Sequence, residues 1–188
     1  TEAWMMSHPC PICQGTGLAP PSACSADAPC RACHGPGQYR RVVALIQARL
    51  GSRRFPAKVL ALIADLPMLQ HVVNRTRQIQ GVEEVIVIAP EGDEFPGITA
   101  TIWHPPVPPD DVLGRYAWAA KQANADIIMR LTSDCPALDP ALCAEILDFF
   151  LTYPDPIGLE YLSNDWRTSG YPSGLDCEVF TREILEEA

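Results

Sequence analysis

The sequence predicts an α/β fold with a mostly parallel sheet, preceded by a small zinc-binding module. Short, continuous apolar runs such as 42–46 and 85–88 are typical of strands buried on both faces of a parallel sheet. They alternate with segments of helical periodicity, which places helices on both faces of that sheet. Residues 1–38 instead lack hydrophobic periodicity and are rich in Cys, Pro and Gly. We therefore expect a module at 1–38 and one α/β domain at 40–188.

The first half of the α/β domain is expected to contain a strand at 42–46, a basic loop, a helix and two further strands. The helix begins near Pro67, because proline is favoured at the first helical position. Its apolar side chains fall on one face: Met68, Leu69, Val72, Val73 and Ile79. The two strands are 85–88 and, with a weaker pattern, 98–103.

The second half begins with the proline-rich stretch 104–109, which excludes a helix or a central strand. Asp110 or Asp111 then caps a helix that runs to about residue 124. The remaining expected elements are a strand at 126–132, a helix from Asp139-Pro140 to about residue 153, and, after a looser section, a strand at 177–180 and a short helix capped by Thr181.

Two Cys-x-x-Cys pairs near the N-terminus have the ligand number and spacing of a closed tetrahedral zinc site. Their cysteines are Cys10, Cys13, Cys30 and Cys33, and Cys24 and His34 are spare donors. Free thiols, a redox pair or disulfides are the alternatives, but the whole Cys-x-x-Cys-x-Gly-x-Gly octet occurs twice. That octet resembles half of the cysteine-rich zinc domain of DnaJ-type chaperones, which implies a zinc knuckle and not chaperone activity. So short a segment would take its folding energy from the metal.

Charge and hydropathy argue against several classes of partner. The formal net charge of −9 argues against nucleic acid or an anionic membrane. No apolar run approaches the roughly 18 residues of a membrane span, and the first residues do not resemble a signal peptide, so we expect a cytoplasmic protein. The charge is unevenly distributed, because residues 28–64 contain no Asp or Glu but several Arg and one Lys. Such a stretch either meets a concentrated anion or is a solvated basic surface.

A basic loop follows the first predicted strand, at the sheet edge where open α/β folds bind ligands. Gly51 allows a close approach of the backbone to phosphate, and Ser52 adds a hydroxyl donor. Arg49, Arg54 and Lys58 can neutralise a polyphosphate. The loop is not a P-loop, because no Gly-Lys-Ser/Thr follows at the required spacing.

Carboxylates follow two later strands. Asp134 comes directly after the strand 126–132, and a parallel sheet brings it to the same edge as the basic loop. Asp176 and Glu178 share one face of the last strand, because side chains alternate along it. Taken alone, each carboxylate is explained as a helix cap or as a solvated loop residue. A carboxylate beside bound phosphates, however, requires a divalent cation between them.

Four segments together resemble the cytidylyltransferase family of spore-coat polysaccharide proteins and CMP-sugar-acid synthetases: 46–60, 111–116, 125–140 and 174–180. The resemblance implies a Rossmann-like nucleotidyltransferase fold, usually dimeric. It also implies a Mg²⁺-dependent reaction in which CTP and a sugar-type acceptor give a CMP-sugar and pyrophosphate. By position it implies nucleotide binding by Gln47, Ala48, Arg49, Gly51, Ser52, Arg54 and Lys58, catalytic roles for Arg49, Lys58 and Asp134, and magnesium binding by Asp134, Asp176 and Glu178.

The sequence departs from the family pattern in three ways. Ala57 stands where the family usually has Gly, and 104–109 replaces the common Gly-Ser before the Asp-Val-Leu motif. Family chains also usually run well past residue 188, so we expect a truncated or minimal version. The alternatives are a nucleotidyltransferase of the same fold with another base or acceptor, and a non-catalytic docking module. The joint presence of Arg49, Lys58, Asp134 and Asp176 favours the enzyme, because a scaffold would not need all four.

Overall fold

The computed structural model describes residues 40–52, 54–152 and 159–188. In these residues six strands form one sheet in the order β5-β4-β1-β6-β8-β7. The strands are β1 (Val42–Gln47), β4 (Glu84–Ile88), β5 (Thr101–Trp103), β6 (Ile127–Thr132), β7 (Tyr161–Ser163) and β8 (Glu178–Thr181). Neighbours among β5, β4, β1 and β6 are parallel, whereas β8 is antiparallel to both β6 and β7. The sheet is mostly parallel, as predicted.

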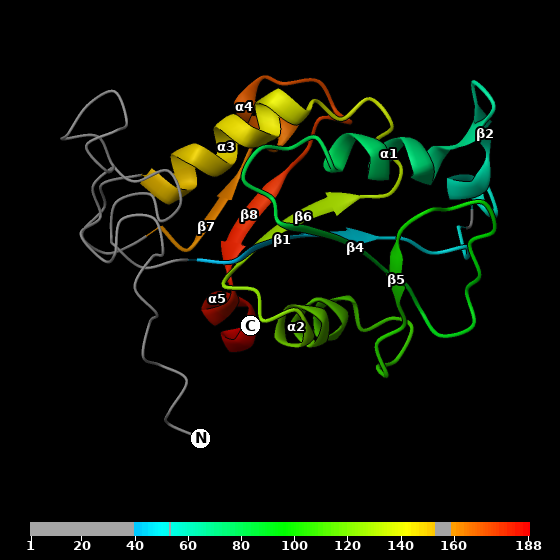
Figure 1. Ribbon diagram of the computed structural model, residues 1–188, viewed down its shortest axis with the longest axis horizontal. Coiled ribbons are helices and arrows are strands. Elements are labelled where there is room, and N and C mark those ends of the chain that lie inside the picture. The colour runs from blue at the N-terminus through cyan, green and yellow to red at the C-terminus, as the bar shows by residue number, and fades with distance from the viewer. Residues whose placement is uncertain (1–39, 53, 153–158) are drawn as a thin grey trace.

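Helices cover both faces of this sheet (Figure 1). On one face lie α1 (Met68–Thr76), α3 (Pro140–Thr152) and the short α4 (Trp166–Ser169), and on the other lie α2 (Val112–Gln122) and α5 (Arg182–Glu187). No helix among the described residues has both the length and the apolar character that a bilayer span requires.

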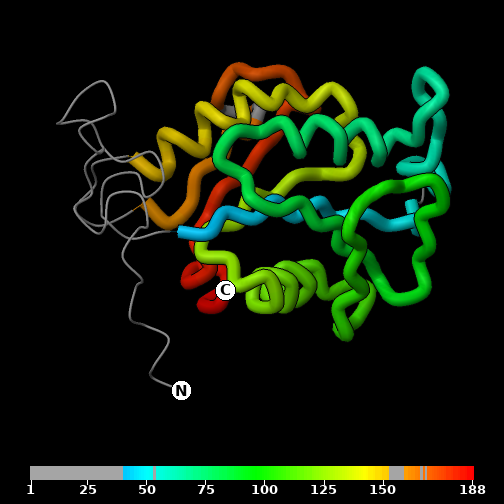
Figure 2. The backbone as a smooth tube through the Cα atoms, viewed as in Figure 1, coloured from blue at the N-terminus to red at the C-terminus, as the bar shows by residue number. Residues whose placement is uncertain are grey.

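The central strand β1 supplies side chains to two separate cores. Ala44 and Ile46 pack in the cluster that contains residues of α1 and α3. Val43 and Leu45 pack in the cluster that contains residues of α2 and α5. The blue β1 in Figure 2 accordingly runs through the middle of the fold, between the two helical layers. A strand that is buried on both faces must be apolar at every position, which is why it appears in the sequence as an unbroken run.

Most predicted elements are present, with shifts at their ends. The strand predicted at 98–103 is shorter, because only Thr101–Trp103 pair with β4. Ile79 was predicted on the apolar face of this helix, but it lies beyond the end of α1, where it is buried in the turn that follows. The hairpin of β2 (Leu62–Ile63) and β3 (Leu66–Pro67) was not expected. Strands of two residues are too short for a periodicity signal.

Capping residues fix the starts of α2 and α5. Of the two aspartates that precede α2, Asp111 is the cap, and its Oδ1 accepts a hydrogen bond of 2.8 Å from the Gly114 N–H. A Cβ atom at Gly114 would lie 2.2 Å from Asp111 Oδ2, so this cap requires glycine there. Thr181 caps α5 as predicted, through a bond from the Ile184 N–H to its hydroxyl.

The order of the strands reverses beside β1, and this reversal places the site. From β1 the chain adds β4 and then β5 on one side, and it returns to add β6 on the other. Gln47 at the end of β1 is paired with Thr132 at the end of β6. The loops that follow these two residues therefore start side by side. In open α/β sheets such a reversal point, at the carboxyl ends of the strands, is where ligands bind.

Candidate active site

A cavity of about 350 Å³ opens where β1 and β6 end. Its polar lining consists of Gln47, Arg49, Ser52, Arg54, Lys58, Arg130, Thr132, Ser133 and Asp134. Four of these side chains are cations and one is a carboxylate, so the cavity suits a polyanion such as a triphosphate. The structure thus brings most of the predicted nucleotide-binding side chains together with Asp134. Ala48 is fully buried, and neither it nor Gly51 is among the lining residues.

Backbone hydrogen bonds fold the loop after β1 into a compact turn. The Ala48 N–H donates to Ile88 O over 3.0 Å, and the Ala57 N–H donates to Leu50 O over 3.0 Å. The second bond closes the loop immediately before Lys58. Ala57 has a φ of 52°, in the left-handed region. Glycine adopts this conformation without strain, which explains why glycine suits the position that Ala57 occupies in this chain.

Gly51 lies at the exposed tip of this loop. Its φ is not in the left-handed region, and a Cβ built there meets no atom within 4 Å. Neither the backbone conformation nor the packing therefore requires glycine at this position. The free space beside the Gly51 backbone leaves room for a ligand to approach it closely.

Lys58 and Asp134 join the two loops. Lys58 begins the short 3-10 helix η1 (Lys58–Leu60), and its Nζ forms an ion pair with Asp134 Oδ2. Partial burial raises the pKa of the Asp134 carboxyl, but the hydrogen bond and the charge of Lys58 outweigh this and hold the pKa below its usual value. Asp134 is therefore ionised at neutral pH and can bind a cation.

Asp176 and Glu178 do not line this cavity. Both are half-buried while their neighbours Cys177 and Val179 are buried, but only Glu178 lies in a strand, because Asp176 precedes β8. Asp176 Oδ2 accepts a bond of 3.1 Å from the Gly174 N–H. Burial raises the pKa of the Cys135 thiol, and the charges of Asp134 and Asp176 raise it further.

The Glu178 carboxylate has a partner within the sheet. It forms an ion pair with Arg130, which lies on the neighbouring strand β6 and lines the cavity. Sequence reasoning did not single out Arg130. The available signal was a charged residue inside an otherwise apolar strand, since burying a charge requires a partner.

Asp93 is a second residue that sequence reasoning missed. It lies in the loop after β4, and its Oδ2 accepts a hydrogen bond of 2.9 Å from the Leu50 N–H. Asp93 thereby holds the middle of the loop that carries Arg49 and Gly51. Nothing in the local sequence signals this contact, because 43 residues separate the two partners.

The residues at this edge fit a magnesium ion only in part. No group of three or more His, Cys, Asp or Glu side chains in the described ranges could enclose a metal. Asp134 already binds one cation, the Lys58 ammonium, whereas Asp176 does not line the cavity. Mg²⁺ commonly takes one or two carboxylates and completes its coordination with water and substrate phosphate oxygens. The donor set therefore fits an ion that arrives with a nucleotide.

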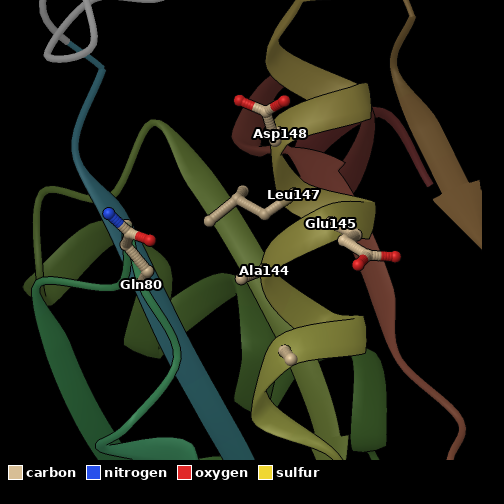
Figure 3. Close-up of a pocket in the computed structure, with 7 residues that line it drawn as sticks. Gln80, Ala144, Glu145, Leu147 and Asp148 are labelled. Atoms are coloured by element: carbon tan, nitrogen blue, oxygen red, sulfur yellow. The ribbon is translucent and has the colours of Figure 1, made fainter.

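A larger cavity, of about 500 Å³, lies elsewhere (Figure 3). It is lined by Gln80 and Gly81 and by residues of α3 that include Glu145 and Asp148. None of its lining residues is cationic, and two are acidic. A triphosphate would be repelled there, so chemistry rather than size identifies the site. The zinc ligands predicted at Cys10, Cys13, Cys30 and Cys33 lie outside the described residues.

Comparison with known proteins agrees with this geometry. The sequence pattern of the cytidylyltransferase family matches residues 43–181. The 3-deoxy-manno-octulosonate cytidylyltransferase of Trichlorobacter lovleyi is 34% identical over 117 residues, which cover 61% of this chain and 46% of that protein. The 8-amino-3,8-dideoxy-manno-octulosonate cytidylyltransferase of Shewanella sediminis is 33% identical over 146 residues, which cover 73% of this chain and 56% of that protein. The chain spans about half the length of these curated relatives.

Solved structures show the same fold. A cytidylyltransferase from Leptospira borgpetersenii has a TM-score of 0.69 and 31% identity, with 79% of this chain and 63% of that chain covered. A CMP:2-keto-3-deoxy-manno-octonic acid synthetase complexed with CTP has a TM-score of 0.59 and 22% identity, with 78% and 76% covered. The fold is therefore an α/β nucleotidyltransferase fold, and the sequence pattern spans the sheet from β1 to β8. The chain belongs to the cytidylyltransferase family.

Proposed function

We propose that this chain transfers CMP from CTP to a hydroxyl group of a sugar-type acceptor and releases pyrophosphate. One observation carries the proposal: Arg49, Ser52, Arg54 and Lys58 line the same cavity as Asp134, at the reversal point of the sheet. The relatives named above, which are cytidylyltransferases of eight-carbon sugar acids, support a sugar-type acceptor.

In this proposal the basic loop holds the triphosphate. Arg49, Arg54 and Lys58 neutralise its charge, and the Ser52 hydroxyl and the backbone beside Gly51 donate hydrogen bonds. The acceptor oxygen attacks the α-phosphorus in line with the bond to the departing pyrophosphate. A new P–O bond forms as that bond breaks, and the proton of the acceptor hydroxyl passes to the surrounding water. The residues act by positioning the reactants and neutralising charge, so no covalent nucleophile is required.

We further propose that Asp134 and Asp176 bind a magnesium ion together with phosphate oxygens. The ion would offset the negative charge that develops between the α-phosphate and pyrophosphate. Lys58 would then move its ammonium from Asp134 toward the triphosphate. The involvement of Glu178 stays a prediction, since its carboxylate is paired with Arg130.

Pyrophosphate release from CTP across a Mg²⁺ titration tests this assignment. Asp134→Asn and Asp176→Asn should keep the melting temperature and lower turnover by orders of magnitude, because each removes a ligand charge and little volume. Asp110→Asn is the matched control, since Asp110 is exposed and lies outside the cavity lining. Turnover near the wild-type level in both test variants would show that the carboxylates are structural.

The remaining expectations are also proposals. We propose that Cys10, Cys13, Cys30 and Cys33 bind one structural zinc ion in a module at 1–38, and that the chain forms a cytoplasmic homodimer. Elemental analysis after washing with chelator should find one zinc per chain, and a protein without zinc would contradict the site. Light scattering of the full chain should give twice the mass of 20.6 kDa.

A further inference from the structure

The strand pairing at one end of the sheet stops beside Asp176. β7 is the edge strand and is antiparallel to β8, and their last paired residues are Ser163 and Glu178 (Figure 1). The next residues along the two segments are Asn164 and Cys177. The Asn164 N–H still donates to Cys177 O over 3.3 Å, as it would if the ladder continued. Asp176 lies one residue beyond this point.

The Asn164 side chain takes over where the backbone ladder ends. Its Oδ1 accepts a hydrogen bond of 2.7 Å from the Cys177 N–H, and its Nδ2 donates one of 3.0 Å to Leu175 O. In an ordinary antiparallel pair the Asn164 carbonyl would accept the Cys177 N–H. Here that carbonyl instead accepts a bond of 2.8 Å from Ser169 Oγ. The side chain thus binds the backbone of both residues that flank Asp176.

These two contacts require a side-chain amide. Asn164 is 6% exposed, so each of its polar groups needs a partner within the protein. The amide supplies one acceptor and one donor at the same reach. A carboxylate would place an oxygen against Leu175 O, and a hydroxyl is shorter. The two bonds therefore hold the backbone at 175–177 in one conformation.

The carboxylate that this backbone carries is itself oriented. Asp176 Oδ2 accepts its bond of 3.1 Å from the N–H of Gly174, two residues earlier. Gly174 has a φ of 99°, which glycine adopts without strain. Gly174 thus orients the carboxylate, while Asn164 fixes the backbone from which the carboxylate projects. Groups that hold a metal ligand in this way strongly affect its affinity for the metal.

We infer that Asn164 is a positioning residue for Asp176 and sets how tightly the proposed site binds its divalent cation. The inference rests on the proposed function, in which Asp176 binds magnesium together with Asp134 and phosphate oxygens. It deepens that proposal, because a carboxylate on a loop loses conformational freedom on binding a cation unless it is already held in place. Asn164 is not among the residues that line the nucleotide cavity, so nucleotide binding without metal should not depend on it.

The test measures binding of Mn²⁺, a paramagnetic substitute for Mg²⁺, to the full chain with CTP and without acceptor. Electron paramagnetic resonance reports the free Mn²⁺. Asn164→Ala should raise the Kd for Mn²⁺ about 10- to 100-fold, because it removes both side-chain bonds. The Kd for CTP in EDTA should stay the same. If Asn164→Ala does not fold, Asn164→Ser keeps a polar group in the buried position and should change the Kd for Mn²⁺ in the same direction.

Two controls separate positioning from stability. Thr76→Val removes a buried hydrogen bond of 2.8 Å to Val72 O in α1, so it should lower the melting temperature without changing the Kd for Mn²⁺. Ser169→Ala removes the bond to the Asn164 carbonyl but leaves both side-chain bonds, so Mn²⁺ should bind as in wild type. A Kd for Mn²⁺ that rises equally in both controls and in Asn164→Ala would show that lost stability alone weakens the site, and would overturn the inference.

A double variant links Asn164 to Asp176. In the Asp176→Asn background the amide has no carboxylate to position, so Asn164→Ala should cause no further loss of Mn²⁺ affinity. A further loss as large as in wild type means that Asn164 acts by another route, which overturns the inference. If Asp176→Asn lowers Mn²⁺ affinity but folded Asn164→Ala does not, the inference fails alone. If neither variant changes it, the magnesium assignment in the proposed function fails as well.

Discussion

The Lys58 ammonium contacts the Asp134 carboxylate although 76 residues separate them in the chain. The contact follows from the sheet, because the last residues of β1 and β6 are paired and the two loops start beside each other. It joins the basic stretch at 28–64, which has no Asp or Glu of its own, to the Asp134 carboxylate. In the proposed function, this pair exchanges the Lys58 ammonium for magnesium when a nucleotide arrives.

Replacing Lys58 with Ala should weaken CTP binding about 10- to 100-fold, because hydrogen bonds to charged groups contribute about 1.5–3 kcal/mol. Binding of cytidine, which has no phosphate, should hardly change. Titration calorimetry measures both affinities. Lys121→Ala is the matched control, since Lys121 lies in the last turn of α2, whereas only the first residue of that helix, Val112, lines the cavity. Equal losses of affinity for CTP and cytidine would show that the loop is only a basic surface.

The Lys58–Asp134 pair should stabilise the fold only above acidic pH. The pKa of Asp134 is lowered from its ordinary value of 3.8, so the folded state binds its proton less readily than the unfolded state does. The stabilisation is complete above the ordinary pKa and disappears as pH falls through the lowered pKa. Because both side chains are partly exposed, it should stay below about 1 kcal/mol. Urea unfolding of wild type and Asp134→Asn at several pH values measures it, and a difference that grows below pH of about 4 would contradict this.

Gly51→Ala should lower the affinity for CTP without destabilising the fold. The added methyl group meets no atom within 4 Å, so the melting temperature should stay the same or rise slightly. The same methyl group occupies space where phosphate is proposed to approach the backbone, so CTP affinity should fall. Unchanged affinity in calorimetry would show that the ligand does not use this part of the loop.

Ala57→Gly should stabilise the protein by about 0.5 kcal/mol. It relieves about 1 kcal/mol of left-handed strain and adds a smaller entropy to the unfolded chain. Ala61→Gly is the matched control, because Ala61 has an ordinary φ of −61° and should only lose stability. Chemical denaturation compares the two, and an equal loss in both variants would show that Ala57 carries no strain.

Asp93→Ala should raise the KM for CTP about five- to tenfold, because the Leu50 N–H loses its acceptor and the loop loosens. Asp93→Asn keeps an oxygen acceptor and should restore most of the affinity. Glu94→Ala, at an exposed neighbour, controls for lost charge. The same KM in Asp93→Ala and wild type would show that the loop keeps its shape without this contact.

Local signals in the sequence predicted most of the fold. The run 42–46 is apolar at every position because its strand is buried on both faces, and Asp111, Asp139 and Thr181 mark helix starts through bonds to nearby backbone. The positions of the basic loop and of Asp134 were predictable because both follow segments that the sequence indicates to be strands of a parallel sheet. The loops that follow parallel strands all start at the same edge of the sheet, whatever the order of the strands.

Tertiary structure alone decided the rest, because it depends on pairs that are distant in the chain. Only the strand order sets β8 beside β6, and so directs Glu178 to Arg130. Only the packing of the loop after β4 against the loop after β1 reveals Asp93 as a partner of Leu50. The burial of Tyr116 depends on α2, β6 and α5 closing around it. Sequence by itself determined which chemical groups are present and on which element each lies; the fold determined which of them touch, since contact energies act between neighbours in space.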